Sequence, residues 1–582
     1  MALWTALLVM LIASPVAHAQ APTWQTVVAT SQATGSNSTV YATASNTFGS
    51  LDVYVGGSFT GTANFDGIAL TSVGGSDAFV AKWSPANNRF TWAQRAGGSG
   101  DDETRALTVR GASVYAAGNF GGPTAAFGAN TLTNAGGSDI FVAKLTDAGA
   151  TSSYAWAAQA GGPGDERARG LALDSLGSSC AGCWDYKGLA GNEFDVYVAG
   201  LFNSPTVGFG TTTLASAGGN DGFVAKLTDD ANRGFFIWAQ RAGGTGDDGI
   251  RGLAVSGASV YAAGYFNSPT VVLGNSTLTN AGGSDVFVTK LNDANAKTSF
   301  VWAQQAGGTG DDRAQGVAAI GSNIFLVGFF GSPTVGFGAT TLASAGGNDG
   351  FVAKLIDAGA TGSFAWALRA GGPKDEFINA IALRRGNSVY VAGSFASPTA
   401  RFGNTTLTNA DAAGSNDIFV AKLKDGGTAG SFAWAQQAGG TGDDRANAVS
   451  VSGTRAYAAG SATPAADFGS QRITSPTELV GFLASLSDIQ LATRASSQMA
   501  EVSIYPNPAH AKAEVRVPAV PGAAEAQIRL TDAVGRVVRS RSVMLPVAGT
   551  SYSLGLADLA PGLYILHVQA KAAYTFRRLV VE

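Results

Sequence analysis

Histidine is nearly absent from this chain. The 582 residues include only His18, His510 and His567, so the long stretch between the first two has none. Ser-His-Asp and Cys-His catalytic arrangements, and histidine-liganded zinc or iron sites, are therefore excluded from that stretch. A pair of carboxylates or an oxygen-ligand cation site is the conventional chemistry left open to it.

Charge and long apolar runs are also scarce. Charged residues make up 13% of the chain, with 37 basic and 41 acidic residues, so we expect no nucleic-acid partner. No run reaches the roughly 18 apolar residues of a membrane helix, so we expect no transmembrane segment. The opening "MALWTALLVMLIASPVAHAQ" is a short apolar run that ends in small-x-small, Ala17-His18-Ala19. This pattern predicts a signal peptide at residues 1–19 and an exported mature protein.

The only two cysteines are Cys180 and Cys183, within "DSLGSSCAGCWDYKGLAGNEFD". A redox motif would accompany a βαβ pattern, and a zinc site would need two more ligands. In an exported protein we interpret the pair as a local disulfide. Trp184 and Tyr186 beside it could bind a sugar or a partner, although packing of the insert on itself is the preferred interpretation.

A repeated sequence pattern covers most of the chain. The tryptophans at 24, 92, 156, 238, 302, 366 and 434 are separated by 68, 64, 82, 64, 64 and 68 residues. Two phrases recur between them, such as "VYVGGSF" at 53–59 and "DAFVAKW" at 77–83. A fixed period of this length indicates a repeat architecture of seven units.

The residue pattern of each unit predicts four β-strands. In the fourth unit they are 251–256, 260–266, 285–291 and 300–308, with one long loop between the second and the third. No segment has a sustained helical period. The chain begins with a lone Trp strand, "PTWQTVVAT", and the last unit lacks one. This complementarity favours a ring closed by the N-terminal strand over a solenoid. The fold class is therefore all-β, a seven-bladed β-propeller of four-stranded blades.

The repeated phrases resemble the bacterial seven-bladed β-propeller repeat family over about residues 23–487. The resemblance implies a propeller domain, which we place at 20–487, and implies no reaction.

The last part of the chain has a different composition. Residues 488–500 are a polar linker, and 501–582 contain short alternating segments that predict a small Ig-like β-sandwich. The phrases "YPNP", "LTDAVGRVV" and "LADLAPGLYILHV" resemble the type A C-terminal sorting domain of the type IX secretion system. The sorting-motif residues are Tyr505, Pro506, Asn507, Pro508, Gly535, Arg536, Gly562 and Tyr564. The resemblance implies that the type IX machinery is a partner, and that the protein reaches the surface or the surroundings of a Gram-negative bacterium. An ordinary accessory sandwich is the alternative.

A doubly acidic turn, such as "AGGTGDDRA" at 438–446, occurs six times. Its candidate binding residues are Asp101, Asp102, Asp165, Glu166, Asp247, Asp248, Asp311, Asp312, Asp375, Glu376, Asp443 and Asp444. Glycines that reverse the backbone and aspartates that bond nearby amides favour a connecting turn. Arg105, Arg167, Arg313 and Arg445 follow the acids and could pair with them locally. Weak calcium binding is the second interpretation and catalysis the third, because six near-identical turns give each acid pair the same environment.

These observations predict a monomeric, non-enzymatic binding, adhesion or structural module with no cofactor and no metal. Its ligand is an unidentified extracellular glycan or protein. The alternative is a hydrolase or lyase that acts on extracellular polysaccharide.

Overall fold

The computed structural model describes residues 22–30, 36–46, 51–173, 194–230, 232–294, 297–384, 388–411, 414–474, 479–488, 502–520, 523–532, 537–546, 548–570 and 573–582. They belong to two compact units, a repeat unit within Gln20–Ile489 and a tail unit within Gln490–Glu582. Across these residues the secondary structure is β-strand without helix, and no helix is available to span a membrane.

The repeat unit contains seven antiparallel sheets that share one order of four strands. The first strands are β2 (Ser38–Ser45), β8 (Asp102–Arg110), β14 (Glu166–Leu173), β20 (Asp248–Ser256), β26 (Asp312–Ile320), β32 (Glu376–Arg384) and β38 (Arg445–Ser452). The second strands are β3 (Val53–Phe59), β9 (Ser113–Phe120), β15 (Asp195–Phe202), β21 (Ser259–Phe266), β27 (Asn323–Phe330), β33 (Ser388–Phe395) and β39 (Arg455–Ala462).

The third strands carry the "DxFVAKL" phrase, which is degraded in the seventh repeat. They are β6 (Asp77–Ser84), β12 (Asp139–Asp147), β18 (Asp221–Asp229), β24 (Asp285–Ala294), β30 (Asp349–Asp357), β36 (Asp417–Asp425) and β42 (Val480–Ser487). The fourth strands carry the repeated tryptophan. They are β7 (Arg89–Gly98), β13 (Ser152–Ala160), β19 (Gly234–Ala242), β25 (Lys297–Ala306), β31 (Gly362–Gly371), β37 (Gly430–Ala438) and, from the start of the chain, β1 (Trp24–Ala29).

The long loop expected between the second and third strands instead contains a hairpin in every repeat. The hairpins are β4 (Thr62–Phe65) with β5 (Ile68–Thr71), β10 (Thr124–Phe127) with β11 (Asn130–Thr133), β16 (Thr206–Phe209) with β17 (Thr212–Ala215), β22 (Thr270–Leu273) with β23 (Ser276–Thr279), β28 (Thr334–Phe337) with β29 (Thr340–Ala343), β34 (Thr399–Phe402) with β35 (Thr405–Thr408), and β40 (Asp467–Phe468) with β41 (Gln471–Arg472). The expectation of one open loop was wrong because alternation over four residues, "TVVL" then "STLT", is enough for a strand when a tight turn joins the two halves.

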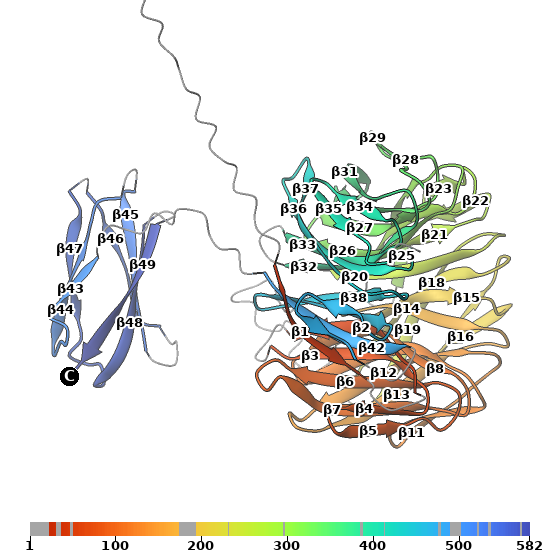
Figure 1. The fold of residues 1–582 in the computed structure, drawn as a ribbon, viewed down its shortest axis with the longest axis horizontal. Helices are drawn as coiled ribbons and strands as arrows, with labels where there is room; N and C mark the ends of the chain where they lie inside the picture. Colours follow the sequence, from red (N-terminus) through yellow and green to blue (C-terminus); the bar gives the residue numbers. More distant parts are fainter. Residues whose placement is uncertain are drawn as a thin grey trace, which may run out of the picture. The chain divides into compact units, whose positions relative to one another are not determined.

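The two ends of the repeat unit meet in one sheet. Strand β1 pairs antiparallel with β42, from Trp24 opposite Leu486 to Ala29 opposite Phe482, as the sequence predicted. Figure 1 shows these strands side by side although about 450 residues separate them. The first strands also contact one another in order, β2 to β8 and on to β38, and β38 contacts β2 again.

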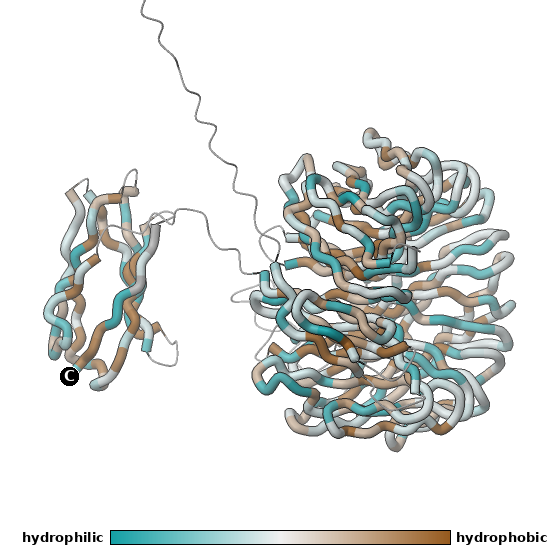
Figure 2. Tube along the Cα trace, viewed as in Figure 1, coloured by the Kyte–Doolittle hydropathy of each residue, from teal (hydrophilic) through white to brown (hydrophobic). Residues whose placement is uncertain are grey.

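The core lies between neighbouring sheets. The second and third strands, such as β3 and β6, are buried along their whole length, because the next sheets cover both of their faces. Strands β2 and β8 alternate for part of their length between buried and half-buried residues. Figure 2 accordingly shows hydrophobic segments running through the sheets of the repeat unit.

The tail unit consists of two antiparallel sheets. One contains β43 (Ser503–Tyr505), β44 (Lys512–Val517) and β47 (Thr550–Gly555), and the other contains β46 (Val537–Met544), β45 (Glu525–Thr531), β48 (Gly562–Ala570) and β49 (Ala573–Val581). Strands β44 and β45 alternate strictly between exposed and buried residues. The buried residues, among them Val515, Ile528 and Leu566, form one hydrophobic core.

Candidate functional site

The first acid of each acidic turn accepts a hydrogen bond from the backbone just before the third strand. Asp101 Oδ1 accepts from the nitrogen of Ser76 at 2.8 Å, and Asp247 Oδ1 from that of Asn220 at 2.9 Å. The other pairs are Asp165 with Ser138, Asp311 with Ser284, Asp375 with Asn348, and Asp443 with Asn416. The first acids therefore tie the turn to the neighbouring loop.

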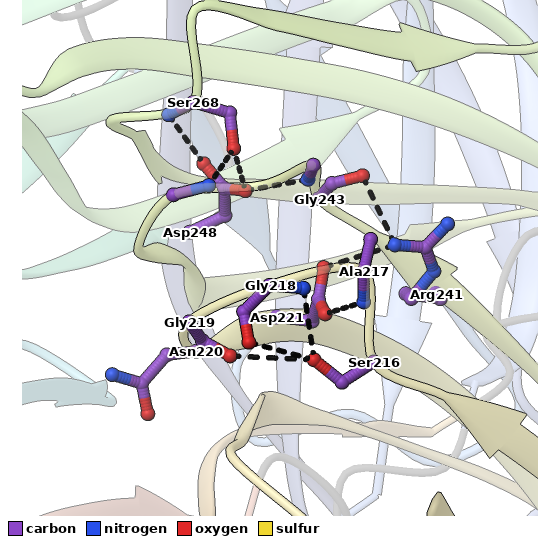
Figure 3. A network of polar contacts seen from close by, with 12 residues as sticks. Ser216, Ala217, Gly218, Gly219, Asn220, Asp221, Arg241, Gly243, Asp248 and Ser268 are labelled. Carbon is purple, nitrogen blue, oxygen red and sulfur yellow. Dashed lines mark hydrogen bonds and ion pairs between the residues drawn. The ribbon is translucent and has the colours of Figure 1, made fainter. Parts of the chain in front are cut away.

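The second acid of each turn is buried at or next to the start of the first strand. Asp248 is the clearest case (Figure 3): it accepts from the nitrogen of Gly244 at 2.6 Å and from Ser268 Oγ at 2.5 Å. Asp102, Glu166, Glu376 and Asp444 likewise accept from a glycine nitrogen four residues earlier, and Asp312 accepts from Ser332 Oγ at 2.7 Å. Burial raises the pKa of Asp102 to about 6 and that of Glu376 to about 7.

A further set of acids begins the third strands and was not recognised as a site from the sequence. Asp77, Asp139, Asp221, Asp285, Asp349 and Asp417 are fully buried, and each accepts a backbone hydrogen bond through Oδ2. In the first repeat, Asp77 and Asp102 lie on either side of Gly97, where φ is 144° and an added Cβ would lie 2.4 Å from both carboxylates. The repeated glycine thus makes room for two buried acids.

The fourth-strand residue that can pair with the aspartate at the start of the third strand alternates between arginine and glutamine from repeat to repeat. Arg95 Nη1 donates to Asp77 at 2.8 Å and Arg241 Nη1 to Asp221 at 3.2 Å, while Arg369 lies 3.6 Å from Asp349. Glutamine stands at the equivalent positions 159, 305 and 437 and bonds to a hairpin backbone instead. Oδ1 of Asp139, Asp285 and Asp417 in these repeats, like that of Asp349, is buried without a hydrogen-bond partner among the described residues. Burial raises the pKa of Asp285 to about 6 and that of Asp417 to about 7.

The repeated tryptophan, lysine and tyrosine donate hydrogen bonds to one aspartate of the following repeat. Asp229 accepts from Tyr115 Oη at 2.6 Å, Lys144 Nζ at 2.5 Å and Trp156 Nε1 at 2.8 Å. Asp147, Asp293, Asp357 and Asp488 accept from the same three residue types, and Asp425 accepts from lysine and tryptophan. These hallmark residues join successive sheets. Asp488, which was expected in the linker, belongs to the repeat unit.

Every first strand carries a β-bulge, and the bulged residue differs between repeats. The register against the second strand skips one residue at Tyr41, Arg105, Arg169, Arg251, Gln315, Asn379 and Asn447. Bulges re-aim a side chain and are common beside functional sites. Three consecutive repeats therefore present arginine where the next three present an amide.

A cavity of about 280 Å³ lies at two of these arginines. It is lined by Arg167, Arg169, Arg251, Asp165, Asn203, Asn220, Leu201 and Tyr265. Arg313 stacks on Tyr265 with its guanidinium carbon 4.5 Å from the ring centre. Arg105 forms an ion pair with Glu103, and Arg313 lies 3.6 Å from Asp311. From the sequence, Arg167 was expected only to pair locally with the acidic turn. The cavity was not predicted, because the bulges at Arg169 and Arg251 leave no mark in the sequence.

The described sorting-motif residues lie on strands β43 and β48 and in the segment that follows β43. Asn507 Nδ2 donates to the carbonyl of Arg578 at 2.8 Å, and its Oδ1 accepts from the nitrogen of Val580 at 2.9 Å. Tyr505 is 79% exposed, and Pro506 and Pro508 are exposed beside it. Gly562 starts β48, where Tyr564 is buried and donates to the carbonyl of Ala560 at 2.8 Å. Gly535 and Arg536, like Cys180 and Cys183, fall outside the described residues.

Comparison with known proteins assigns the tail. Residues 503–582 match the model of the secretion system C-terminal sorting domain. Regulatory protein FlaEY of Caulobacter vibrioides is 29% identical over 188 residues, which cover 31% of this chain and 18% of that protein. The crystal structure of dimeric latent PorU from Porphyromonas gingivalis is 10% identical with a TM-score of 0.13, over 67% of this chain and 31% of that one. The chain spans less than a third of either protein. It is a protein exported by type IX secretion to the cell surface or extracellular space, with residues 503–582 as its C-terminal sorting domain.

Proposed function

We propose that the repeat unit is a seven-bladed β-propeller closed by β1, and that it acts outside the cell as a non-enzymatic binding module. The observation that carries the proposal is the circuit of first-strand contacts from β2 to β38 and back, with a polar cavity at the bulges on β14 and β20. Propeller ligands are typically held by residues around the central axis. The tail unit is proposed to be the Ig-like sandwich that engages the type IX machinery.

The acidic turns support binding without catalysis. Each first acid is committed to a backbone amide, and each second acid is buried and accepts hydrogen bonds from the connection that it stabilises. A catalytic pair would need two carboxylates that both have access to substrate, whereas the second acid of each turn is buried. No cofactor and no structural metal are part of this proposal. Among the described residues no three acids, cysteines or histidines form a potential metal-binding group.

The test uses the purified mature chain on glycan and protein arrays, with the same polysaccharides assayed for release of reducing ends and of unsaturated products. We expect binding without turnover. Turnover by the purified chain that persists through a further chromatographic step would contradict the non-enzymatic assignment.

A further inference from the structure

The cavity at the bulges of β14 and β20 contains arginines whose hydrogen-bonding capacity is only partly met by the protein, since Tyr265 provides one side-chain hydrogen bond to Arg251. The Nε atoms of Arg169 and Arg251 are buried and have no partner among the described residues. The same holds for the Nε atoms of Arg105 and Arg313, whose terminal nitrogens do pair with Glu103 and with Ser284. No carboxylate lies within ion-pair distance of Arg169 or Arg251 in the described part of the chain.

The other repeats show what a bulged residue does when its role is structural. Asn379 Nδ2 donates to the carbonyl of Ala446 on the next first strand at 3.0 Å, and Asn447 Nδ2 donates to that of Val40 at 2.9 Å. These amides join neighbouring sheets. The arginines at 169 and 251 make no such bond to the next sheet in the described structure, although they occupy the same bulge position.

Clustering these cations is costly for the folded chain. Burial, reinforced by the charges of Arg105 and Arg251 and only partly opposed by the charge of Glu103, lowers the pKa of Arg169 to about 9. Removing a guanidinium from water without a counter-charge is unfavourable, and an anion between two such groups reverses that cost. Arginine is also the side chain best suited to bidentate recognition of anionic oxygens.

We propose that this cavity binds the carboxylate or sulfate group of an acidic polysaccharide, with Arg169 and Arg251 as the principal anion ligands. The inference rests on the proposed binding function and specifies the ligand class. Arg167 at the rim adds a third positive charge against the single carboxylate of Asp165.

The size and lining of the cavity favour a sugar over a free anion or an acidic peptide. About 280 Å³ is roughly nine times the share of one water molecule in the liquid, so the cavity is larger than a lone anionic group. Asn203 and Asn220 place amides beside the arginines, which suits the hydroxyls of a sugar ring. Leu201 is the one aliphatic residue in the lining, so the side chains that flank an acidic residue in a peptide would find little apolar surface.

The test is calorimetric titration of the mature full-length chain at low salt with four probes. These are a trigalacturonate, a sulfated galactan oligosaccharide, a neutral galactan oligosaccharide and an oligoglutamate peptide. The variants are R169Q and R251Q, which place at each bulge the residue that position 315 carries naturally. The control is R445Q, an exposed arginine at the start of β38.

We expect one or both acidic oligosaccharides to bind, at least tenfold more weakly to R169Q and to R251Q, and unchanged to R445Q. The melting temperatures of R169Q and R251Q should equal or exceed that of the wild type, because each substitution relieves repulsion between half-buried cations. The preferred probe then shows whether the natural anion is a carboxylate or a sulfate.

Three results would overturn this inference. They are acidic-sugar binding that survives both substitutions, failure of both acidic sugars to bind, and arginine-dependent binding of oligoglutamate alone. Array binding of another ligand, unaffected by R169Q, would leave the proposed binding function standing while removing the acidic-sugar assignment. Turnover of a polysaccharide would instead remove the proposed function.

Discussion

At the scale of single residues, the repeat is a set of buried polar contacts that recur from sheet to sheet. One aspartate collects the lysine, the tryptophan and usually the tyrosine of the preceding repeat, as Asp229 does with Tyr115, Lys144 and Trp156. In the turns at Gly97, Gly243 and Gly371, two further acids lie beside the glycine. Truncating one member of such a buried network leaves the other members buried without a hydrogen-bond or charge partner. These residues are therefore coupled more tightly than surface ion pairs.

The alternation between arginine and glutamine predicts opposite effects of one substitution. Asp417 is fully buried, and Gln437 stands at the position where three other repeats have arginine. Burial raises the pKa of Asp417 to about 7, and the charges of Asp444 and Asp411 contribute to this rise. Because this pKa lies above the ordinary value, the protonated acid favours the folded state. That contribution is complete below about pH 4 and is lost as the pH rises through about 7.

We therefore expect Asp417→Asn to raise the melting temperature by several degrees at pH 8 and to change it little at pH 4.5. The matched control is Asp77→Asn, which removes the partner of Arg95 and should lower the melting temperature at pH 8. Thermal unfolding of both variants at the two pH values checks this. A lower melting temperature for Asp417→Asn at pH 8 would show that the carboxylate is ionised and stabilising.

At the scale of elements, the sequence predicted the strands that carry conspicuous residues and missed the features that do not. The phrases around Tyr54, Lys82 and Trp92 marked three strands of every repeat, because their residues must be buried and paired. The short hairpins were not predicted, because a strand of four residues shows too little alternation between apolar and polar residues to be recognised. The aspartate at the start of the first six third strands can be read from the sequence. Its burial beside the turn could not be predicted, because that burial depends on contacts with the next repeat. The bulges, and with them the arginine cavity, arise from register between strands, which no single strand encodes.

Strand β1 provides the test at this scale. It fills the place of a fourth strand beside β42, buries Trp24 and donates from Trp24 Nε1 to the carbonyl of Gln437 at 2.8 Å. Deleting Trp24–Ala29 should cost at least about 3–5 kcal/mol, the usual loss for a buried large aromatic side chain alone. We expect a clearly lower melting temperature and a lower midpoint of urea unfolding.

The control for this deletion is Gln25→Ala, which changes an exposed side chain of the same strand and should leave both values unchanged. If the deletion also leaves them unchanged, β1 does not close the repeat unit.

At the scale of the whole molecule, the two units have separate tasks. The tail unit addresses the protein to type IX secretion, while the repeat unit is the part proposed to act after export. The tail was predictable because its motifs lie at fixed places near the C-terminus. The proposed anion site was not predictable, because six of the seven repeats match one another so closely that the differences at the bulged positions were overlooked.

Deleting residues 503–582 should stop delivery to the cell surface and leave the repeat unit in the periplasm. Cell fractionation with an antibody against the repeat unit measures this. Alanine at Asn507, which bonds to the backbone of Arg578 and Val580, should reduce export less completely because the rest of the tail fold remains. Surface delivery of the truncated chain at wild-type levels would contradict the assignment of the tail as the sorting signal.

The central claim is that seven sheets surround one axis, with β1 and β42 in the same sheet and the arginine cavity at the first strands. An experimental structure of the mature chain, by crystallography or electron microscopy, tests it most directly. The account predicts seven four-stranded sheets around a common axis, with Trp24 opposite Leu486 and with Arg169 and Arg251 lining one cavity near that axis. A different number of sheets, or a β1 that leaves β42 unpaired, would contradict it.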